Sequence, residues 1–497
     1  MIALDLQPYS IVQDRGFQEL LAEAVPHYEP PSRTTLSWTL IPRLYHETRS
    51  KVQAELDAAL GDGVESMSFT SDMWTSQAND SYISLTCHFT DANFTVKRYS
   101  LDTSLFSGRH TAAQIAEVLD NLVQSWNIPD DEFPVYIVTD NARNFRAAAR
   151  ELPWIERPCF AHSLQLAIQT VKEQTPVLGT LLRKARAIVG HYKHSPQAQE
   201  RLDNYQKKTW NTPLHLIQDV ETRWNSEYNM LSTLLELRGP VTVDMANSEC
   251  IVDCFTGAEW RLAADYVQVL KPLAQATTEA EGEKYPTLSC QVPTLYCIIQ
   301  SLRTTCRTKM TADGCAFAAN VEKSLRTRFP DYDMDKDACV AMFCDPRYKL
   351  VVFHEDSARE EWLKSVVLKE MGQHVATNME FEVERTETAV ACSLWSAFDR
   401  VVETQHKKFD PSSEFHLYST ESAVTRGSDP CKWWNEVCQH KFPILGKLAR
   451  KYLGIPATSA SSERAFSVAG NVATPRRASL LPSHVQQLTF LHDNLRL

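Results

Sequence analysis

Short apolar runs and helical periods alternate along the first part of this chain. Three runs in succession, at residues 68–75, 82–89 and 94–101, are rich in β-branched and aromatic side chains and predict three short strands. Residues 111–123 then carry apolar side chains at helical spacing. The run 135–139 predicts a buried strand, because both of its faces are apolar or β-branched. The order of these elements predicts a β-β-β-α-β-α unit.

Helical periods dominate the middle of the chain. They are clear at residues 230–237 and 266–273, and no strand alternation of note interrupts them. Before them, the apolar segment 214–217 predicts a fifth strand. We therefore expect an α+β protein, in which a mixed five-stranded sheet with helices is interrupted by a large all-α insertion.

These patterns also predict the domain boundaries. We place an N-terminal helical region at residues 1–62 and the first part of the sheet domain at residues 63–225. The helical insertion then occupies residues 226–440, and residues 441–497 complete the sheet domain. Roughly three domains are also what the length of the chain suggests.

Three acidic side chains stand out by their positions relative to these elements. Asp72 lies in the first predicted strand, and Asp140 directly follows the fourth. Glu463 follows serines that can cap a helix, in a first turn where the helix dipole favours a negative charge. Each acid taken alone is more simply explained as a turn or capping residue. Together they form the ligand set that Mg²⁺ or Mn²⁺ prefers, and a pair of such ions supports phosphodiester cleavage and strand transfer.

Five motifs of the chain point to a known family. They are residues 71–76, 138–144, 159–164 and 221–226 and the long C-terminal block 433–494. These motifs resemble the hAT superfamily of DNA transposases and their BED-finger relatives, over nearly the whole chain. The resemblance implies a ribonuclease-H-like catalytic domain. It also implies that Asp72, Asp140 and Glu463 are catalytic acids and metal ligands, which cut DNA at a transposon end and join that end to a target.

The same resemblance places Arg223 and Trp224 beside the active site, in contact with DNA. An arginine can hold a phosphate, and a tryptophan can stack on an unpaired base. For Trp224, packing under the helical insertion is an equal alternative.

Cys159 and His162 follow the fourth predicted strand and open an apolar helix. In the family this pair braces the catalytic core. A structural zinc site needs four ligands, and this pair is not followed by a second one. We therefore favour packing and hydrogen bonding over a zinc site.

The C-terminal block is rich in large apolar side chains. They include Trp433, Trp434, Phe442, Leu448 and Tyr452. The resemblance assigns this region to dimerisation, so we expect a homodimer or a higher homo-oligomer. The alternative is that these side chains pack on the sheet of their own chain.

Composition sets the cellular context. The cysteines are scattered without pairwise spacing and no apolar run is long enough for a membrane span, so we expect reduced thiols in the cytosol or nucleus. With the family resemblance, we predict a nuclear protein. The net charge of −11 does not favour general attraction to DNA, but residues 441–497 carry eight Lys and Arg against two acids. We expect DNA to dock near this basic end, which contains Glu463. An ordinary solvated helix face is the alternative.

Two functions are consistent with these features. The complete set of acids favours a metal-dependent DNA transposase core, that is, an enzyme of phosphodiester transfer. No zinc-finger pattern of the BED type occurs in the chain, so we expect that finger to lie on sequence outside it, or the protein to be a truncated or domesticated descendant. The alternative function is therefore a dimeric nuclear scaffold that works in transcription.

Overall fold

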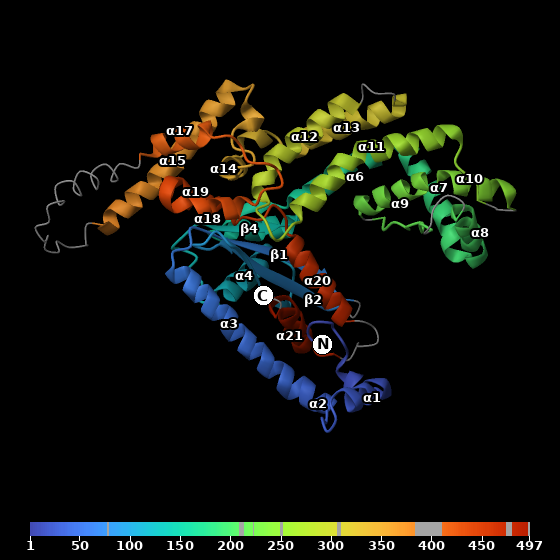
Figure 1. Ribbon diagram of the computed structural model, residues 1–497, viewed down its shortest axis with the longest axis horizontal. Coiled ribbons are helices and arrows are strands. Elements are labelled where there is room, and N and C mark those ends of the chain that lie inside the picture. Colours follow the sequence, from blue (N-terminus) through green and yellow to red (C-terminus); the bar gives the residue numbers. More distant parts are fainter. Residues whose placement is uncertain are drawn as a thin grey trace, which may run out of the picture. The chain divides into compact units, whose positions relative to one another are not determined.

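The computed structural model describes the chain except for residues 77–78, 208–212, 222, 249–251, 306–309, 383–409, 474–479 and 496–497. The described residues form two compact units, whose helices and strands are labelled in Figure 1. The first, which we call the sheet unit, comprises Met1–Cys159, Glu281–Gln291 and Lys336–Leu497. The second, the helical unit, comprises Phe160–Ala280 and Val292–Asp335. These units divide the chain at other positions than the predicted domain boundaries, which stay predictions.

Five strands form one mixed sheet in the sheet unit. They are β1 (Met67–Thr75), β2 (Ser81–Thr90), β3 (Val96–Leu105), β4 (Val135–Thr139) and β5 (Ile155–Pro158). Their order across the sheet is β3-β2-β1-β4-β5. β2 pairs antiparallel with β1 and β3, whereas β4 pairs parallel with β1 and β5. The α+β class, the mixed five-stranded sheet and the first four predicted strands are therefore confirmed.

The fifth strand was predicted at the wrong place. Residues 214–217 lie outside the sheet, and Leu214 and Ile217 are exposed. The observed β5 has the sequence Ile-Glu-Arg-Pro, which is too polar to stand out as an apolar run. Its backbone pairs with β4 from Ile155 to Pro158. Because β5 is an edge strand, it tolerates a proline and needs little apolar surface, so its sequence gives a weak signal.

Helices from both ends of the chain belong to the sheet unit. Those before the sheet are η1 (Tyr9–Gln13), α1 (Arg15–Ala24), α2 (Arg33–Thr35), η2 (Leu36–Leu40) and α3 (Ile41–Gly61), and those between strands are α4 (Ala112–Gln124) and α5 (Arg143–Glu151). Later in the chain follow η3 (Leu288–Cys290), α14 (Lys336–Cys344), η5 (Val351–Phe353), α15 (Ser357–Glu382), α17 (Pro411–Thr420), α18 (Pro430–Lys441), α19 (Pro443–Leu453), α20 (Ala460–Val472) and α21 (Pro482–Asn494). In the described part of the chain, no helix combines the length and apolar character that a bilayer crossing needs.

Alternation along the strands gives the sheet two different faces. On one face, Phe69 and Ile137 are fully buried in a core cluster that also contains Leu119 of α4. Successive strand residues point to opposite faces, so Thr70 and Asp72 of β1 lie on the other face. That second face therefore carries the polar side chains of β1 and needs polar partners.

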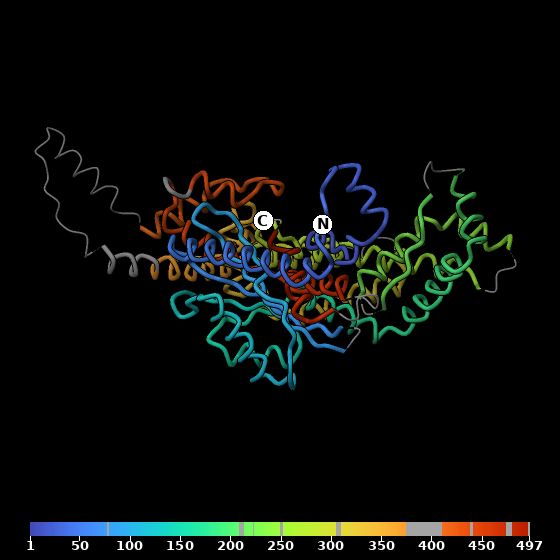
Figure 2. Tube along the Cα trace, turned by 90° about the horizontal axis from the view of Figure 1, so that it is seen from below, coloured from blue at the N-terminus to red at the C-terminus, as the bar shows by residue number. Residues whose placement is uncertain are grey.

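The C-terminal helices supply those partners. α20 packs against β1 and β2, and α21 packs against β3. Ser462 of α20 shares a hydrogen bond of 2.7 Å with the hydroxyl of Thr70. At the far end of the same hairpin, Phe94 stacks on Trp434 of α18 with 5.9 Å between ring centroids, and both views place α18 beside the turn between β2 and β3 (Figures 1 and 2). Residues after 430 thus complete the fold that residues 67–139 begin.

The helical unit is held together around buried charges. Its helices are α6 (Phe160–Glu173), α7 (Pro176–His194), α8 (Pro196–Gln206), α9 (Trp224–Glu236), α10 (Arg238–Asn247), α11 (Gly257–Ala280), most of α12 (Gln291–Thr305), α13 (Ala312–Arg328) and η4 (Tyr332–Met334). Glu227 on α9 is fully buried, and it accepts hydrogen bonds from Lys172 at 2.7 Å and from Arg186 at 3.0 Å. A buried carboxylate is costly unless it is paired, so these contacts tie α6 and α7 to α9.

Candidate active site

The pairing of β1 with β4 brings two of the predicted acids together. The last residues of this parallel pairing are Ser71 and Thr139. Asp72 and Asp140 are the next residues after these two, so they lie side by side just beyond the paired part of β1 and β4. Both side chains are partly buried. Sequence reasoning placed Asp72 within a strand and Asp140 at the end of one, and the structure confirms both positions.

Glu463 lies in the first turn of α20, as the sequence indicated. The neighbouring Ser462 fixes this turn on β1 through Thr70. Ser459 stands at the N-cap, but its side chain makes no capping hydrogen bond, and only its carbonyl accepts the N–H of Glu463, at 3.3 Å. The side chain of Glu463 is exposed and has no hydrogen bond or ion pair within the described part of the chain. Its position therefore depends on how α20 itself is held.

The charges of the three acids act on one another. Burial is the largest of the effects that raise the pKa of Asp72 to about 7; the negative charges of Asp140 and Glu463 also contribute, and the hydrogen bond from the Met73 N–H opposes the rise. That hydrogen bond is 2.7 Å long. A carboxyl group with such a pKa is half protonated near neutral pH, and a nearby cation would favour its ionised form. The three acids thus bring negative charges near one another, and among the described residues no positive group is among the causes that shift the pKa of Asp72.

The donor set suits a hard divalent cation. Carboxylate oxygens from Asp72, Asp140 and Glu463 are the ligands that Mg²⁺ and Mn²⁺ prefer. The described residues contain no group of three His, Cys, Asp or Glu side chains already close enough together to hold a metal ion. The acids therefore interact through their charges without forming a closed ligand cluster in this conformation.

Cys159 contacts the segment that precedes the Glu463 helix. The thiol is fully buried, and its sulfur accepts the N–H of Ser459 at 3.4 Å. This contact suits the predicted bracing role of Cys159. His162 is partly buried on α6, in the helical unit.

Of the two residues predicted to contact DNA, Trp224 is buried and Arg223 is exposed. Trp224 is 2% exposed, and its backbone N–H donates to the side-chain oxygen of Gln165 at 3.3 Å within the helical unit. The packing alternative therefore describes Trp224, because a buried ring is not available for stacking on a base in this conformation. Arg223 is exposed at the N-cap of α9.

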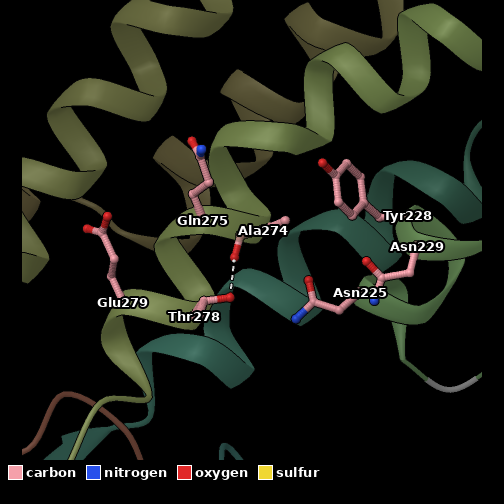
Figure 3. Close-up of a pocket in the computed structure, with 7 residues that line it drawn as sticks. All are labelled: Asn225, Tyr228, Asn229, Ala274, Gln275, Thr278 and Glu279. Carbon is pink, nitrogen blue, oxygen red and sulfur yellow. Dashed lines mark hydrogen bonds between the residues drawn. The ribbon is translucent and has the colours of Figure 1, made fainter. Parts of the chain in front are cut away.

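An open pocket follows this pair along α9. It has a volume of about 400 Å³ and is lined by α9 and α11, as Figure 3 shows. Its lining residues are Asn225, Tyr228, Asn229, Ala274, Gln275, Thr278 and Glu279. Thr278 donates to the carbonyl of Ala274 at 3.1 Å, and amide side chains make up much of the remaining lining. The pocket belongs to the helical unit alone.

The side chains predicted to form a dimer interface are buried or partly buried within the single chain. Trp434, Phe442, Leu448 and Tyr452 are fully buried, and Trp433 is partly buried. The packing alternative thus accounts for them in the single chain. Their role in self-association stays a prediction.

The basic end of the chain is largely paired with acids of the same unit. Arg450 lies 2.9 Å from Glu65, and Lys451 lies 2.9 Å from Glu370. Arg464, next to Glu463, lies 2.6 Å from a carboxylate oxygen of Glu283. Sequence reasoning counted these cations as free positive charge and missed Glu283 altogether. The sequence hints at this pairing only through the three glutamates within residues 279–283, which lie about 180 residues before Arg464.

Comparison with protein families adds three matches. Residues 414–495 match the hAT family C-terminal dimerisation region, which includes Glu463. Residues 70–154 match the ZBED1 RNase-like domain, and residues 157–269 match the ZBED1 RNase-like helical domain.

Curated relatives align with most or all of the chain. Zinc finger BED domain-containing protein 4 of Homo sapiens is 26% identical over the whole chain, which covers 43% of that relative. The protein named Putative AC transposase of Zea mays is 25% identical over 98% of the chain and 63% of its own length. The protein named Putative transcriptional regulator tpeD of Talaromyces stipitatus is 25% identical over 88% of the chain and 54% of its own length. The chain spans about half the length of these relatives. By its matched regions and its relatives, the chain is similar to hAT transposases and to BED-domain zinc-finger proteins.

Proposed function

We propose that this protein carries out metal-dependent cleavage and transfer of DNA strands. The observation that carries the proposal is the raised pKa of Asp72, which results from burial and from the charges of Asp140 and Glu463. Three carboxylates whose negative charges repel one another cost stability unless a cation joins them. Bound Mg²⁺ or Mn²⁺ would activate an attacking oxygen and stabilise a leaving one.

The residues of this chain would divide the work between them. Asp72 and Asp140 offer ligand oxygens from adjacent strands, and each is oriented by a backbone N–H, from Met73 and Ala142 respectively. Glu463 offers a third carboxylate from the first turn of α20. Arg223 is the exposed cation that would hold a phosphate of the DNA.

The proposed cellular location and oligomeric state rest on the relatives and on the matched dimerisation region. We place the protein in the nucleus, because its relatives include proteins named as transposases and as a transcriptional regulator. A homodimer is expected from the matched dimerisation region.

The direct test measures metal binding and DNA cleavage on the whole chain. Mn²⁺ binding is titrated by electron paramagnetic resonance, and cleavage is followed on labelled duplex and plasmid DNA with Mg²⁺ or Mn²⁺. We expect Asp72→Asn, Asp140→Asn and Glu463→Gln each to abolish cleavage and to weaken Mn²⁺ binding. Asp80→Asn is the matched control, since Asp80 is partly buried at the start of β2 but lies outside the set of three. Equal binding and cleavage by all four variants would contradict the proposal.

A dimeric regulator without strand transfer is the second candidate. The open arrangement of the acids within the described residues and the ion pairs that occupy the basic end favour it. In that case the wild-type protein binds DNA or self-associates, but shows no cleavage that depends on Asp72.

A further inference from the structure

A short segment of the sheet unit connects two parts of the helical unit along the chain. Residues 281–291, which we call the strap, follow α11 directly and lead into α12. The strap itself belongs to the sheet unit, whereas α11 and most of α12 belong to the helical unit. The strap therefore connects the end of α11 to the start of α12 through the sheet unit.

The strap grips the start of α20 on both sides of Glu463. Glu283 lies 2.6 Å from Arg464, and it accepts a hydrogen bond from Ser461 at 3.1 Å. Arg464 also donates to the carbonyl of Glu281 at 2.5 Å. The residues at positions 461 and 464 flank Glu463 within a single helical turn, so these contacts fix the direction of that turn.

Two further contacts make the grip rigid. Thr287 of the strap accepts the N–H of Ala457, just before α20, at 2.9 Å. Glu283 also pairs with Arg98 of β3 at 3.3 Å, which ties the strap to the sheet. The strap thus forms a bridge from β3 to the first turn of α20.

Glu463 has no contact of its own that could replace this bridge. Its side chain is exposed and lacks a hydrogen bond or ion pair among the residues that the structure describes. The hydrogen bond between Ser462 and Thr70 and the contact of Cys159 with the Ser459 N–H also support this turn. A rotation of the turn about these contacts would move Glu463 relative to Asp72.

We propose that Glu283 is a positioning residue for Glu463, and that the strap thereby holds the first turn of α20 in place relative to β1. This inference rests on the proposed metal-dependent function. Glu283 touches neither DNA nor metal in this scheme, and it acts through Ser461 and Arg464.

The test compares two carboxylate variants in the whole chain. Glu283→Gln keeps the side-chain volume and removes the charge that holds Arg464. Glu65→Gln is the matched control, because Glu65 pairs with Arg450 of α19 at 2.9 Å in a partly buried setting. A double variant, Glu283→Gln with Arg464→Gln, shows whether both residues act through one contact.

Two measurements decide the question. Hydrogen–deuterium exchange of residues 457–466 reports how firmly the start of α20 is held. Mn²⁺ affinity reports the geometry of the acids, and a supporting residue of this kind typically changes metal affinity by about tenfold or more. We expect Glu283→Gln to raise exchange in this segment and to weaken Mn²⁺ binding about tenfold, the double variant to lose no more than the single one, and Glu65→Gln to change neither measurement.

Each contrary outcome has its own meaning. Wild-type exchange or wild-type Mn²⁺ affinity in a folded Glu283→Gln protein overturns the inference and leaves the proposed function standing. If the double variant loses more Mn²⁺ affinity than Glu283→Gln alone, the proposal that Glu283 and Arg464 act through one contact is wrong. A wild-type protein that binds Mn²⁺ no better than Asp72→Asn overturns the proposed function, and the inference falls with it.

Discussion

Thr70 and Ser462 share a hydrogen bond of 2.7 Å although 392 positions separate them in the sequence. Thr70 lies two residues before Asp72 on β1, and Ser462 lies directly before Glu463 on α20. The Thr70 hydroxyl also contacts Thr86 of β2 at 2.6 Å, which continues the polar network across the sheet. This single contact relates the first predicted acid to the last one.

Glu463→Gln should separate a metal ligand from a simple helix-start acid. The side chain is exposed and unpaired in the described structure, so we expect a folded protein whose free energy of unfolding changes by at most about 1 kcal/mol. We expect metal-dependent cleavage to disappear. Chemical denaturation and the cleavage assay together check both parts. Cleavage at the wild-type rate in the folded variant would count against the catalytic assignment.

Asp72→Asn should stabilise the protein at alkaline pH in the absence of divalent ions. The pKa of Asp72 is raised to about 7 in the folded state, from an ordinary value of 3.8, so the folded state binds a proton that the unfolded state has released between these values. The free energy of unfolding contributed by this group therefore falls as pH rises from about 4 to about 7. At pH 8 we expect the variant to be more stable by about 1 to 4 kcal/mol.

Denaturation in EDTA at pH 5 and pH 8 measures this effect, and added Mn²⁺ reverses its sign. The metal binds the ionised carboxylate, so it should stabilise the wild-type protein more than the variant. An equal pH dependence for both proteins would show that the pKa of Asp72 is not raised in the folded state.

The sequence indicated the sheet better than it indicated the surroundings of the site. Runs of apolar, β-branched and aromatic residues marked β1 to β4, and the two aspartates could be placed because strand ends are local features. β5 escaped detection because an edge strand needs few apolar residues. The pairing of Glu283 with Arg464 could not be predicted either, since it joins positions about 180 residues apart whose residue types are common on any protein surface.

The burial of Trp224 and of the C-terminal aromatic residues shows a second limit. A large apolar side chain in a motif is consistent with contact to DNA, contact to a second chain or packing in its own core. Only the three-dimensional neighbours decide between these, as the buried contact of Trp434 with the carbonyl of Cys344 illustrates.

Glu370→Gln should destabilise the sheet unit at neutral pH and lose its effect in acid. Burial opposes ionisation of Glu370, but hydrogen bonds from Lys336 and Lys451 outweigh it and lower the pKa to about 2. The stabilisation by the ionised carboxylate is present above its ordinary value of 4.5 and is lost as pH falls through about 2. At pH 7 we expect a loss of about 3 kcal/mol, because a buried lysine remains without its partner.

Denaturation of the wild type and the variant at pH 7 and pH 3 checks this prediction. Glu361→Gln is the control on the same helix, since its ion pair with Lys364 is exposed and should contribute less than about 0.5 kcal/mol. A difference between wild type and Glu370→Gln that stays constant with pH would show that the charge of Glu370 does not stabilise the fold.

Trp434→Ala should act on folding rather than on self-association. The indole is fully buried, stacks on Phe94, and donates its N–H to the carbonyl of Cys344 at 2.7 Å. Truncation removes this hydrogen bond and leaves a large cavity, so we expect a loss of about 3 to 5 kcal/mol in the free energy of unfolding. Thermal denaturation measures the loss, and light scattering of the protein that remains folded measures the oligomeric state. A folded, fully stable variant that has become monomeric would instead place Trp434 in the interface between two chains.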